Sequence, residues 1–199
     1  GLAWGAAHAQ IENPNYRIVH QWANDFDEDT CETYRNNICP DNRDSVYCED
    51  VHTLDINKLG DIDAFSFGFP CNDFSIVGEQ KGFNGDFGAL YTYGVTVLKI
   101  FQPQWFLAEN VSGLSSANKG VAFKKILDDL RAVGYKVFPH LYKFEEYGVP
   151  QSRHRIIIVG IRENLPYDFK PPSTDPYKEV DISVRTALSD PPIDKMAFN

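Results

Sequence analysis

Apolar residues recur along this 199-residue chain with two alternating periods. Short runs rich in β-branched and aromatic residues predict strands, and segments with apolar residues three and four positions apart predict helices. Alternation of the two is typical of an α/β domain with a mostly parallel sheet. The predicted strands span residues 16–24, 46–48, 62–68, 104–109, 135–142 and 155–161, and the predicted helices span residues 1–10, 27–36, 89–101 and 120–133.

Two stretches of the chain lack both periods. Residues 76–88 hold four glycines in thirteen positions, which predicts a long mobile loop because glycine loses the most conformational freedom on ordering. Beyond Glu163, six prolines indicate extended connecting chain. We therefore expect one domain over residues 1–163, followed by an extended proline-rich segment over residues 164–199.

Composition excludes two broad classes of protein. Hydrophobic residues make up 43% of the chain and aromatic residues 14%, which is enough for a packed core and excludes intrinsic disorder. The 28 acidic residues outnumber the 19 basic ones, and the net charge of −9 argues against a protein held to nucleic acid by bulk positive charge. A local basic groove remains compatible with this charge.

Cysteine usage and the lack of long apolar runs indicate the compartment. The cysteines form neither a CxxC pair nor a dense framework, so we expect reduced thiols and interpret Cys31, Cys39 and Cys48 as buried and inert. No apolar run approaches the ~20 residues of a membrane helix, and no charged-then-apolar leader opens the chain, so we expect a soluble intracellular protein. Because the first residue is Gly1 and the only methionine is Met196, we expect a segment of something longer.

Polar residues at the ends of predicted strands are the candidates for chemistry, because ligands bind beyond the carboxyl ends of strands in open α/β sheets. Asp25 follows the first predicted strand, where a carboxylate can hold ribose hydroxyls or serve as an ordinary acid at a helix start. Asp50 follows the second and can accept a hydrogen bond from an adenine amino group, or be a loop acid. Cys71 follows Pro70 at a strand end, where nucleophiles are displayed and loop amides can lower a thiol pKa.

A second set of candidates lies near the later strands. Glu109 ends the predicted strand 104–109 beside apolar residues, and such surroundings suit a carboxyl group to donating a proton or a hydrogen bond. Arg153 and Arg155 are two residues apart at the start of a strand and therefore project to one face. Two guanidinium groups on one face fit a phosphate or a carbonyl-rich heterocycle, and they fit an edge-strand surface pair equally well.

Three segments resemble, in the same order, the signature motifs of the cytosine-5 DNA methyltransferases. They are residues 68–72 (GFPCN) with Phe74 and Ser75, residues 109–111 (ENV), and residues 150–155 (PQSRHR). Weaker similarity extends from Gly1 to about Pro192. Residues 1–2 resemble the end of the glycine-rich first motif, and residues 24–26 resemble the ribose-binding acid with its aromatic neighbour. Residues 49–51 resemble the adenine-contacting segment, and residues 80–83 resemble the catalytic loop. Residues 184–188 resemble a helix leading toward the recognition region.

The resemblance implies a Rossmann-like, S-adenosylmethionine-dependent methyltransferase fold, with helices on both faces of a mostly parallel sheet. The implied reaction transfers a methyl group from S-adenosylmethionine to C5 of a flipped-out cytosine in DNA, with no metal. Cys71 would add to C6 of the base, and Glu109 would act at N3. Arg155 would hold O2, and Arg153 would order Cys71 and a nearby phosphate. The loop at residues 76–88 would close over the base.

Further site residues are implied by the same motifs. The residues implied to bind the methyl donor are Asp25, Phe26, Asp50, Val51, Pro70 and Leu90. The residues implied to bind the nucleic acid substrate are Asn72, Ser75 and Asn110.

The chain departs from the family pattern at three points. The strand and leading glycines that normally precede Gly1 are missing, Asn72 stands where the family most often has glutamine, and we expect the recognition region and the last two motifs to lie beyond Asn199. The expected partners are double-stranded DNA and a cognate restriction endonuclease, with no membrane. The expected location is the bacterial cytoplasm, associated with the nucleoid, or the nucleus in a eukaryote.

Three other functions are alternatives to methylation of DNA. The same chemistry could act on transfer RNA, which no sequence feature favours over DNA. A non-catalytic scaffold of this fold has no chemical reason to retain Cys71, Glu109, Arg153 and Arg155 together. A cysteine hydrolase needs a histidine base, and the five histidines show no recognisable pairing with the cysteine.

Overall fold

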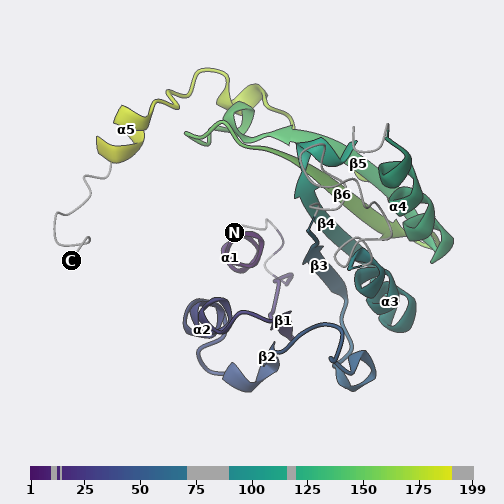
Figure 1. Ribbon diagram of the computed structural model, residues 1–199. Helices are drawn as coiled ribbons and strands as arrows, with labels where there is room; N and C mark the ends of the chain where they lie inside the picture. The colour runs from purple at the N-terminus through teal and green to yellow at the C-terminus, as the bar shows by residue number, and fades with distance from the viewer. Residues whose placement is uncertain (10–12, 14, 71–89, 116–119, 190–199) are drawn as a thin grey trace. The chain divides into compact units, whose positions relative to one another are not determined.

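The computed structural model describes residues 1–9, 13, 15–70, 90–115 and 120–189 (Figure 1). The chain divides into two compact units, and each is described by itself. Unit 1 comprises Gly1–Ala64 and Thr96–Pro103, and unit 2 comprises Phe65–Val95 and Gln104–Asn199. The loop predicted at residues 76–88 lies outside the described residues, and the domain boundary expected after residue 163 stays a prediction.

Unit 1 is built on a parallel pair of short strands. β1 (Ala23–Asp25) pairs with β2 (Val46–Cys48), and Asp25 lies opposite Cys48. Helix α2 (Glu28–Asn37) connects the two strands and packs on both. Its N-cap is Asp27, whose carboxylate accepts a hydrogen bond from the Thr30 N–H at 2.8 Å. The helix predicted at residues 27–36 and the strand predicted at residues 46–48 are therefore confirmed.

The strand predicted at residues 16–24 is wrong for most of its length. Only Ala23–Asp25 pairs with a neighbouring strand. The residues before it make side-chain contacts in place of a ladder, such as the 2.7 Å hydrogen bond between His20 Nε2 and Ser45 Oγ. Aromatic and β-branched residues favour a strand only where a partner strand supplies backbone donors and acceptors. The helix predicted at the start of the chain is confirmed as α1 (Leu2–Ala7).

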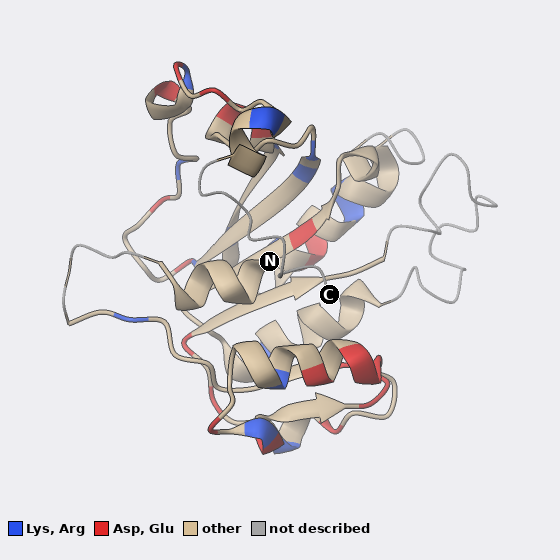
Figure 2. Cartoon of the chain, turned by 90° about the vertical axis from the view of Figure 1, so that its left-hand side faces the viewer, with Lys and Arg blue, Asp and Glu red and all other residues tan. Residues whose placement is uncertain are grey.

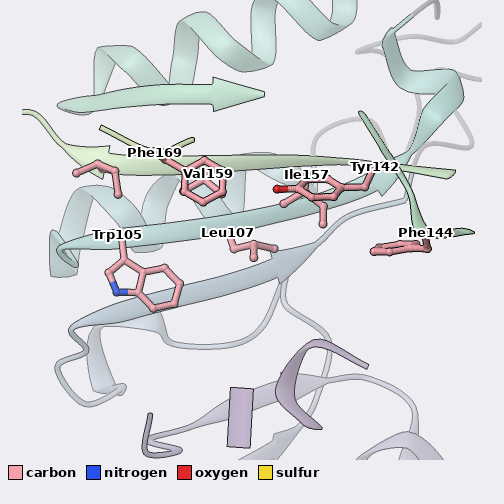
Figure 3. Close-up of a pocket in the computed structure, with 8 residues that line it drawn as sticks. Trp105, Leu107, Tyr142, Phe144, Ile157, Val159 and Phe169 are labelled. Carbon is pink, nitrogen blue, oxygen red and sulfur yellow. The ribbon is translucent and has the colours of Figure 1, made fainter. Parts of the chain in front are cut away.

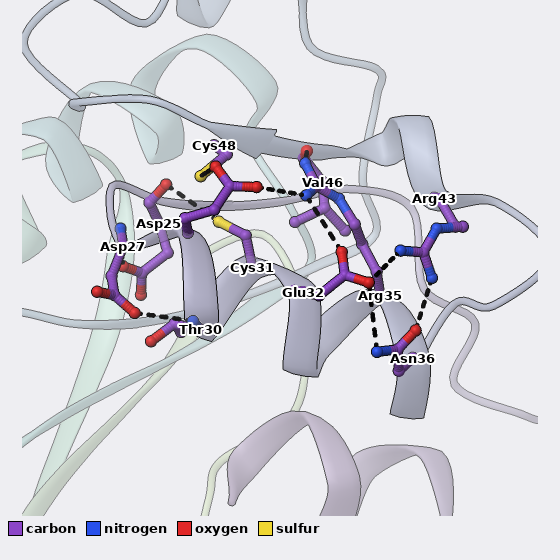
Figure 4. Close-up of polar contacts among 11 residues, drawn as sticks. Asp25, Asp27, Thr30, Cys31, Glu32, Arg35, Asn36, Arg43, Val46 and Cys48 are labelled. Atoms are coloured by element: carbon purple, nitrogen blue, oxygen red, sulfur yellow. Dashed lines mark hydrogen bonds and ion pairs between the residues drawn. The ribbon is translucent and has the colours of Figure 1, made fainter.

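Three cysteines lie in or beside the small core of unit 1, and all three are free thiols. Figure 4 shows two of them, Cys31 and Cys48. Cys31 and Cys39 are buried with Val46, as predicted. The prediction of a buried Cys48 needs correction, because this residue is only half-buried and its Sγ donates to Glu28 Oε2 at 3.2 Å. The adjacent Cys31 thiol and the Glu28 carboxylate raise the pKa of Cys48 to about 12, so it remains a thiol near neutral pH.

Acidic and basic residues lie close together on α2 and on the helical turn before β2 (Figure 2). Arg35 lies 3.4 Å from Glu28 and donates to the carbonyl of Val46 at 3.0 Å, which ties the helix to the start of β2. Arg43 lies 2.5 Å from Glu32. Here the two signs of charge compensate each other and form no basic surface.

Unit 2 holds a four-stranded sheet in the order β3-β4-β6-β5. β6 runs antiparallel to both neighbours, with Arg155 opposite Val111 on one side and opposite Tyr142 on the other. The hydrophobic pattern identified all four strands but did not show which neighbours run parallel or antiparallel, because a run of apolar residues carries no information on strand direction. The strands are β3 (Ala64–Gly68), β4 (Trp105–Val111), β5 (Tyr135–Lys143) and β6 (His154–Arg162).

Two helices accompany this sheet along the chain. α4 (Val121–Ala132) buries its apolar stripe, including Ile126 and Leu130, and packs on β5. The Tyr91 hydroxyl, at the start of α3 (Tyr91–Phe101), donates to Asp129 of α4 at 2.7 Å. Burial and the adjacent carboxylate raise the pKa of Tyr91, so the hydroxyl keeps its proton. The helices predicted at residues 89–101 and 120–133 are confirmed over their described residues.

The two faces of β4 and β6 pack differently. On one face the ring of Phe106 lies over Gly160, which is its partner in the strand register. The other face forms an apolar hollow of about 390 Å³ with residues that follow β5 and β6 (Figure 3). The residues lining this hollow are Trp105, Leu107, Tyr142, Phe144, Ile157, Val159, Ile161 and Phe169.

After β6 the described chain, as far as Ser189, has little regular secondary structure. A helical turn forms at Asp175–Tyr177, and α5 (Val184–Ser189) follows, at the position where the resemblance implied a helix. Lys136 of β5 anchors the start of this segment through the Leu165 carbonyl at 3.1 Å and the Asp168 carboxylate at 2.8 Å. No helix in the described part of the chain has both the length and the apolar character needed to cross a membrane.

Candidate active site

Three charged side chains converge where β4 ends and β6 begins. Arg155 Nε lies 2.9 Å from Glu109 Oε1, and Arg153 Nη2 lies 3.8 Å from the same oxygen. Arg155 Nη1 also donates to the carbonyl oxygen of His154 at 2.8 Å. The structure therefore brings together three of the four residues that the sequence predicted to carry catalysis.

Strand direction and register place these side chains. Because β4 and β6 are antiparallel, the carboxyl end of β4 adjoins the start of β6. Glu109 lies two residues before Val111, the partner of Arg155, so Glu109 and Arg155 are diagonal neighbours on one face of the sheet. Arg153 lies just before the first residue of β6 and shares the orientation of Arg155.

The cluster is partly open to solvent. The side chains of Arg155, Glu109 and Arg153 are 20%, 27% and 43% exposed. The Glu109 carboxylate thus faces two guanidinium groups. A planar heterocycle placed against the cluster would meet a carboxyl group and two planar sets of N–H donors, which can pair with ring nitrogen and carbonyl groups.

Asn110 lies behind the cluster and is almost completely buried, at 3% exposure. Its Nδ2 donates to the carbonyl of Phe69 at 2.9 Å, and its Oδ1 accepts from the N–H of Val111 at 2.8 Å. Both polar atoms of this side chain are therefore bonded to the main chain. The arrangement ties β4 to the segment that leads into Cys71, and it does not favour the direct substrate contact expected of Asn110.

The end of β3 also lies beside the cluster. A Cβ atom at Gly68 would be 3.8 Å from Glu109 Oε2, so the last residue of β3 adjoins the carboxylate. Pro70 and Leu90, which were expected to contact the methyl donor, are half-buried in unit 2. The remaining predicted residues of this region lie outside the described part of the chain: Cys71, Asn72 and Ser75.

Unit 1 holds the other residues expected to bind the donor. Asp25 ends β1, and Asp50 lies two residues beyond β2, so the parallel pairing places both at one edge of this pair of strands. The Glu49 N–H donates to the Asp25 carbonyl at 3.0 Å and holds this edge together. The Phe26 side chain is 80% exposed and leaves an aromatic face free, while Val51 is half-buried.

The Asp50 carboxylate is fixed by the residue two positions later. Its Oδ1 accepts a hydrogen bond from the His52 N–H at 2.9 Å and contacts His52 Nδ1 at 2.5 Å. These interactions lower the pKa of Asp50, mainly through the backbone hydrogen bond, so the group is an ionised acceptor at neutral pH. In this form both carboxylate oxygens are acceptors, which suits the group to an amino donor.

The sequence did not single out a short side-chain hydrogen bond next to the arginines. Glu145 Oε1 lies 2.6 Å from His154 Nε2, and the hydrogen bond from this imidazole lowers the pKa of Glu145. The only signal in the sequence was the position of His154 between two arginines, and nothing in the spacing indicated its acidic partner. Within the described residues, no group of three or more His, Cys, Asp and Glu side chains is arranged to hold a metal ion.

Comparisons with known proteins point to one family. A family model described as C-5 cytosine-specific DNA methylase matches residues 1–196. The chain is 55% identical over 207 residues to the Type II methyltransferase M.BbvI of Brevibacillus brevis, covering 98% of this chain and 55% of the relative. It is 40% identical over 153 residues to M.NgoFVII of Neisseria gonorrhoeae, covering 76% of this chain and 40% of the relative. The chain thus spans about half the length of the curated relatives it matches.

Solved structures share the fold. A crystal structure of a candidate DNA modification methyltransferase encoded in an E. coli prophage aligns with a TM-score of 0.68 and 26% identity, covering 94% of this chain and 51% of that one. The Dnmt2 methyltransferase of S. pombe aligns with a TM-score of 0.58 and 19% identity, covering 81% of this chain and 48% of that one. The α/β methyltransferase fold predicted from the sequence is therefore confirmed.

Proposed function

This chain belongs to the C-5 cytosine-specific DNA methylase family, and on that premise we propose that it carries out methyl transfer from S-adenosylmethionine to C5 of cytosine in double-stranded DNA. The observation that carries the proposal is the convergence of Arg155 and Arg153 on the Glu109 carboxylate, at 2.9 and 3.8 Å. Glu109 and Arg155 lie in two separate motifs, and the fold brings them to one point.

The methyl donor fits the edge of unit 1. Asp25 and Asp50 present carboxylates beyond two parallel strands, and Phe26 offers an exposed aromatic ring for an adenine to stack on. Asp50 is ionised and would accept from the adenine amino group, while Asp25 would accept from the ribose hydroxyls. Val51 belongs to the same proposed donor site in unit 1, and Pro70 and Leu90 of unit 2 are proposed donor contacts on the family resemblance alone. When bound, S-adenosylmethionine supplies an electrophilic methyl group.

The proposed chemistry begins at Cys71. Its thiolate adds to C6 of the flipped-out cytosine, forming an S–C bond and moving an electron pair toward C5 and N3. Carbon C5 would then take the methyl group, and the electron pair of the broken S–CH3 bond would leave with S-adenosylhomocysteine. Loss of the C5 proton to a base returns an electron pair to the ring, any proton taken up at N3 goes back to Glu109, and the thiolate leaves as the aromatic ring is restored.

The three described residues of the cluster have separate tasks in this reaction. Glu109 protonates N3 or donates a hydrogen bond to it as charge builds on the ring. Arg155 holds the base through O2, and Arg153 orders Cys71 and a neighbouring phosphate. Because Asn110 donates to the Phe69 carbonyl, we assign it to positioning the chain that leads to the nucleophile. Asn72 and Ser75 remain proposed substrate contacts.

The Type II names of the relatives support a role beside a cognate restriction endonuclease, with the modified DNA as the shared substrate. In that role the methyl group marks host DNA, and the protein acts at the nucleoid. Residues 164–199 would connect this catalytic part to a region that recognises the target sequence.

Covalent trapping tests the proposal. The intact protein is incubated with S-adenosylmethionine and duplex DNA in which 5-fluorocytosine replaces every cytosine, so that the recognition sequence need not be known. Fluorine at C5 blocks the final elimination, and we expect a protein–DNA adduct that survives denaturation. Cys71→Ser should abolish the adduct, and Cys48→Ser serves as the matched control that retains it.

Two results would overturn the assignment. An adduct with Cys71→Ser would place the nucleophile elsewhere. Trapping on 5-fluorocytosine transfer RNA, with none on the duplex, would replace DNA by RNA as the substrate.

A further inference from the structure

Glu145 and His154 form a short hydrogen bond next to the arginine segment. Glu145 lies in the helical turn Phe144–Tyr147, which connects β5 to β6, and its Oε1 is 2.6 Å from His154 Nε2. The other carboxylate oxygen, Oε2, is buried and has no hydrogen-bond partner among the described residues. A buried carboxylate oxygen without a partner is destabilising, and the hydrogen bond of Oε1 with His154 offsets part of that cost.

The side chain of His154 forms no hydrogen bond with Glu109 or Arg155, and His154 is connected to them through hydrogen bonds of the main chain. It stands between Arg153 and Arg155, and alternation along the strand directs its side chain to the opposite face. Its carbonyl oxygen accepts a hydrogen bond from Arg155 Nη1 at 2.8 Å, and the carbonyl of Arg153 accepts from the Phe144 N–H at 3.0 Å. The two residues before Arg155 are therefore held by the turn on one side and by the Arg155 guanidinium on the other.

We propose that Glu145 and His154 are positioning residues, which fix the main chain at residues 153–154 and thereby hold the Arg155 guanidinium on Glu109. The inference rests on the proposed function, because it assigns a task within the same site. Loss of the Glu145–His154 hydrogen bond leaves the β5–β6 ladder in place but frees the turn from the start of β6. Fewer molecules then hold Arg155 in the orientation that the base requires.

The charges around the turn support this assignment. The hydrogen bond from His154 lowers the pKa of Glu145, so the carboxylate is ionised at neutral pH. The adjacent Glu146 has a different partner, Lys143, at 3.1 Å. The same turn thus carries two carboxylates that each have a side-chain partner, and only Glu145 is linked to the arginine segment. This difference supplies a matched control.

The first test compares Glu145→Gln with Glu146→Gln in the intact protein. Both changes keep the side-chain size and an acceptor oxygen and remove one charge. A displacement of about 1 Å at a reacting group can slow a reaction on the order of 100-fold, so we expect single-turnover methyl transfer to fall about 10-fold or more in Glu145→Gln. Affinities for duplex DNA and S-adenosylmethionine should change less than about 3-fold. Glu146→Gln should transfer at the original rate.

The second test exchanges the other partner. His154→Phe keeps a ring without a donor, whereas His154→Gln retains an N–H that can reach Glu145. We expect the phenylalanine variant to be slow and the glutamine variant to recover most of the rate. Rates are expressed per active site, counted by trapping on the 5-fluorocytosine duplex, so that a loss of folded protein does not count as a loss of rate.

A readout without catalysis separates this inference from the proposed function. In the original protein, Glu109 should protect the Arg155 Nε–H from exchange with solvent, as measured by NMR, and Glu145→Gln should remove that protection while Glu146→Gln should not. If the original protein transfers no methyl group, the proposed function fails and the NMR comparison still decides the positioning role. Unchanged protection in Glu145→Gln, or equal rates in the two glutamine variants, would overturn the inference.

Discussion

Replacing Gly160 by alanine tests the packing that sets the register of β4 and β6. A Cβ atom added at Gly160 would lie 1.9 Å from Cε1 and 2.4 Å from Cζ of Phe106, far inside van der Waals contact. The Phe106 ring is fully buried. Its centroid lies 5.1 Å from the Tyr135 ring in an edge contact and 6.2 Å from the Phe67 ring, so it has little room to move away.

Two opposing effects set the size of the change. Forcing an extra carbon into a packed core typically costs about 1–3 kcal/mol, and the closeness of this contact points to the upper end. Alanine in place of glycine within a strand returns about 0.5–1 kcal/mol, because alanine loses less conformational freedom on folding. We therefore expect Gly160→Ala to lower the free energy of unfolding by about 2 kcal/mol.

Urea denaturation measures this loss, and the slope of the unfolding free energy against urea concentration should stay unchanged. Gly113→Ala is the control, because a Cβ there meets nothing within 4 Å, and its effect should stay within about 0.5 kcal/mol. Shortening the facing side chain in the double variant Gly160→Ala/Phe106→Leu should make the two changes less than additive. A Gly160→Ala protein as stable as the original would refute the packing of Phe106 over Gly160, and with it the register that aligns Glu109 with Arg155.

Three further predictions concern the proposed sites and acid stability. Arg155→Lys keeps the charge but loses the planar set of donors, so the rate of single-turnover methyl transfer should fall at least ~10²-fold while affinity for duplex DNA barely changes. A normal rate of transfer would place Arg155 outside the active site. Asp50→Ala should weaken binding of S-adenosylmethionine about 10-fold or more in calorimetry, and an unchanged affinity would place the adenine elsewhere. Hydrogen bonds from Thr30 lower the pKa of Asp27 below its ordinary 3.8, so this N-cap stabilises the fold at neutral pH and loses its effect as the pH falls through that lowered value. The unfolding free energy of Asp27→Asn should therefore fall less than the original's on acidification below about pH 4, and parallel curves would contradict the role.

Local sequence patterns determined most of the elements and the identity of the candidate residues. The helix at Glu28–Asn37 follows from its N-cap Asp27, and α4 follows from an apolar stripe at helical spacing, since both signals are contained within a few residues. The same kind of signal showed that Arg153 and Arg155 share a face. The motif residues carried the family resemblance, which the family model then confirmed.

Tertiary structure alone decided which of these residues meet. Strand pairing joins residues that are far apart in the chain, and a shift of one position would turn a side chain to the other face of the sheet. The register that places Val111 opposite Arg155 brings Glu109 to the two arginines, and no local pattern specifies it.

Non-local contacts also determined the burial of Asn110, whose amide bonds the chain after β3, and the pairing of Glu145 with His154. The strand predicted across residues 16–24 was wrong before Ala23 for the same reason. Its composition favoured an extended chain, but whether a ladder forms depends on a partner strand that the segment itself does not encode.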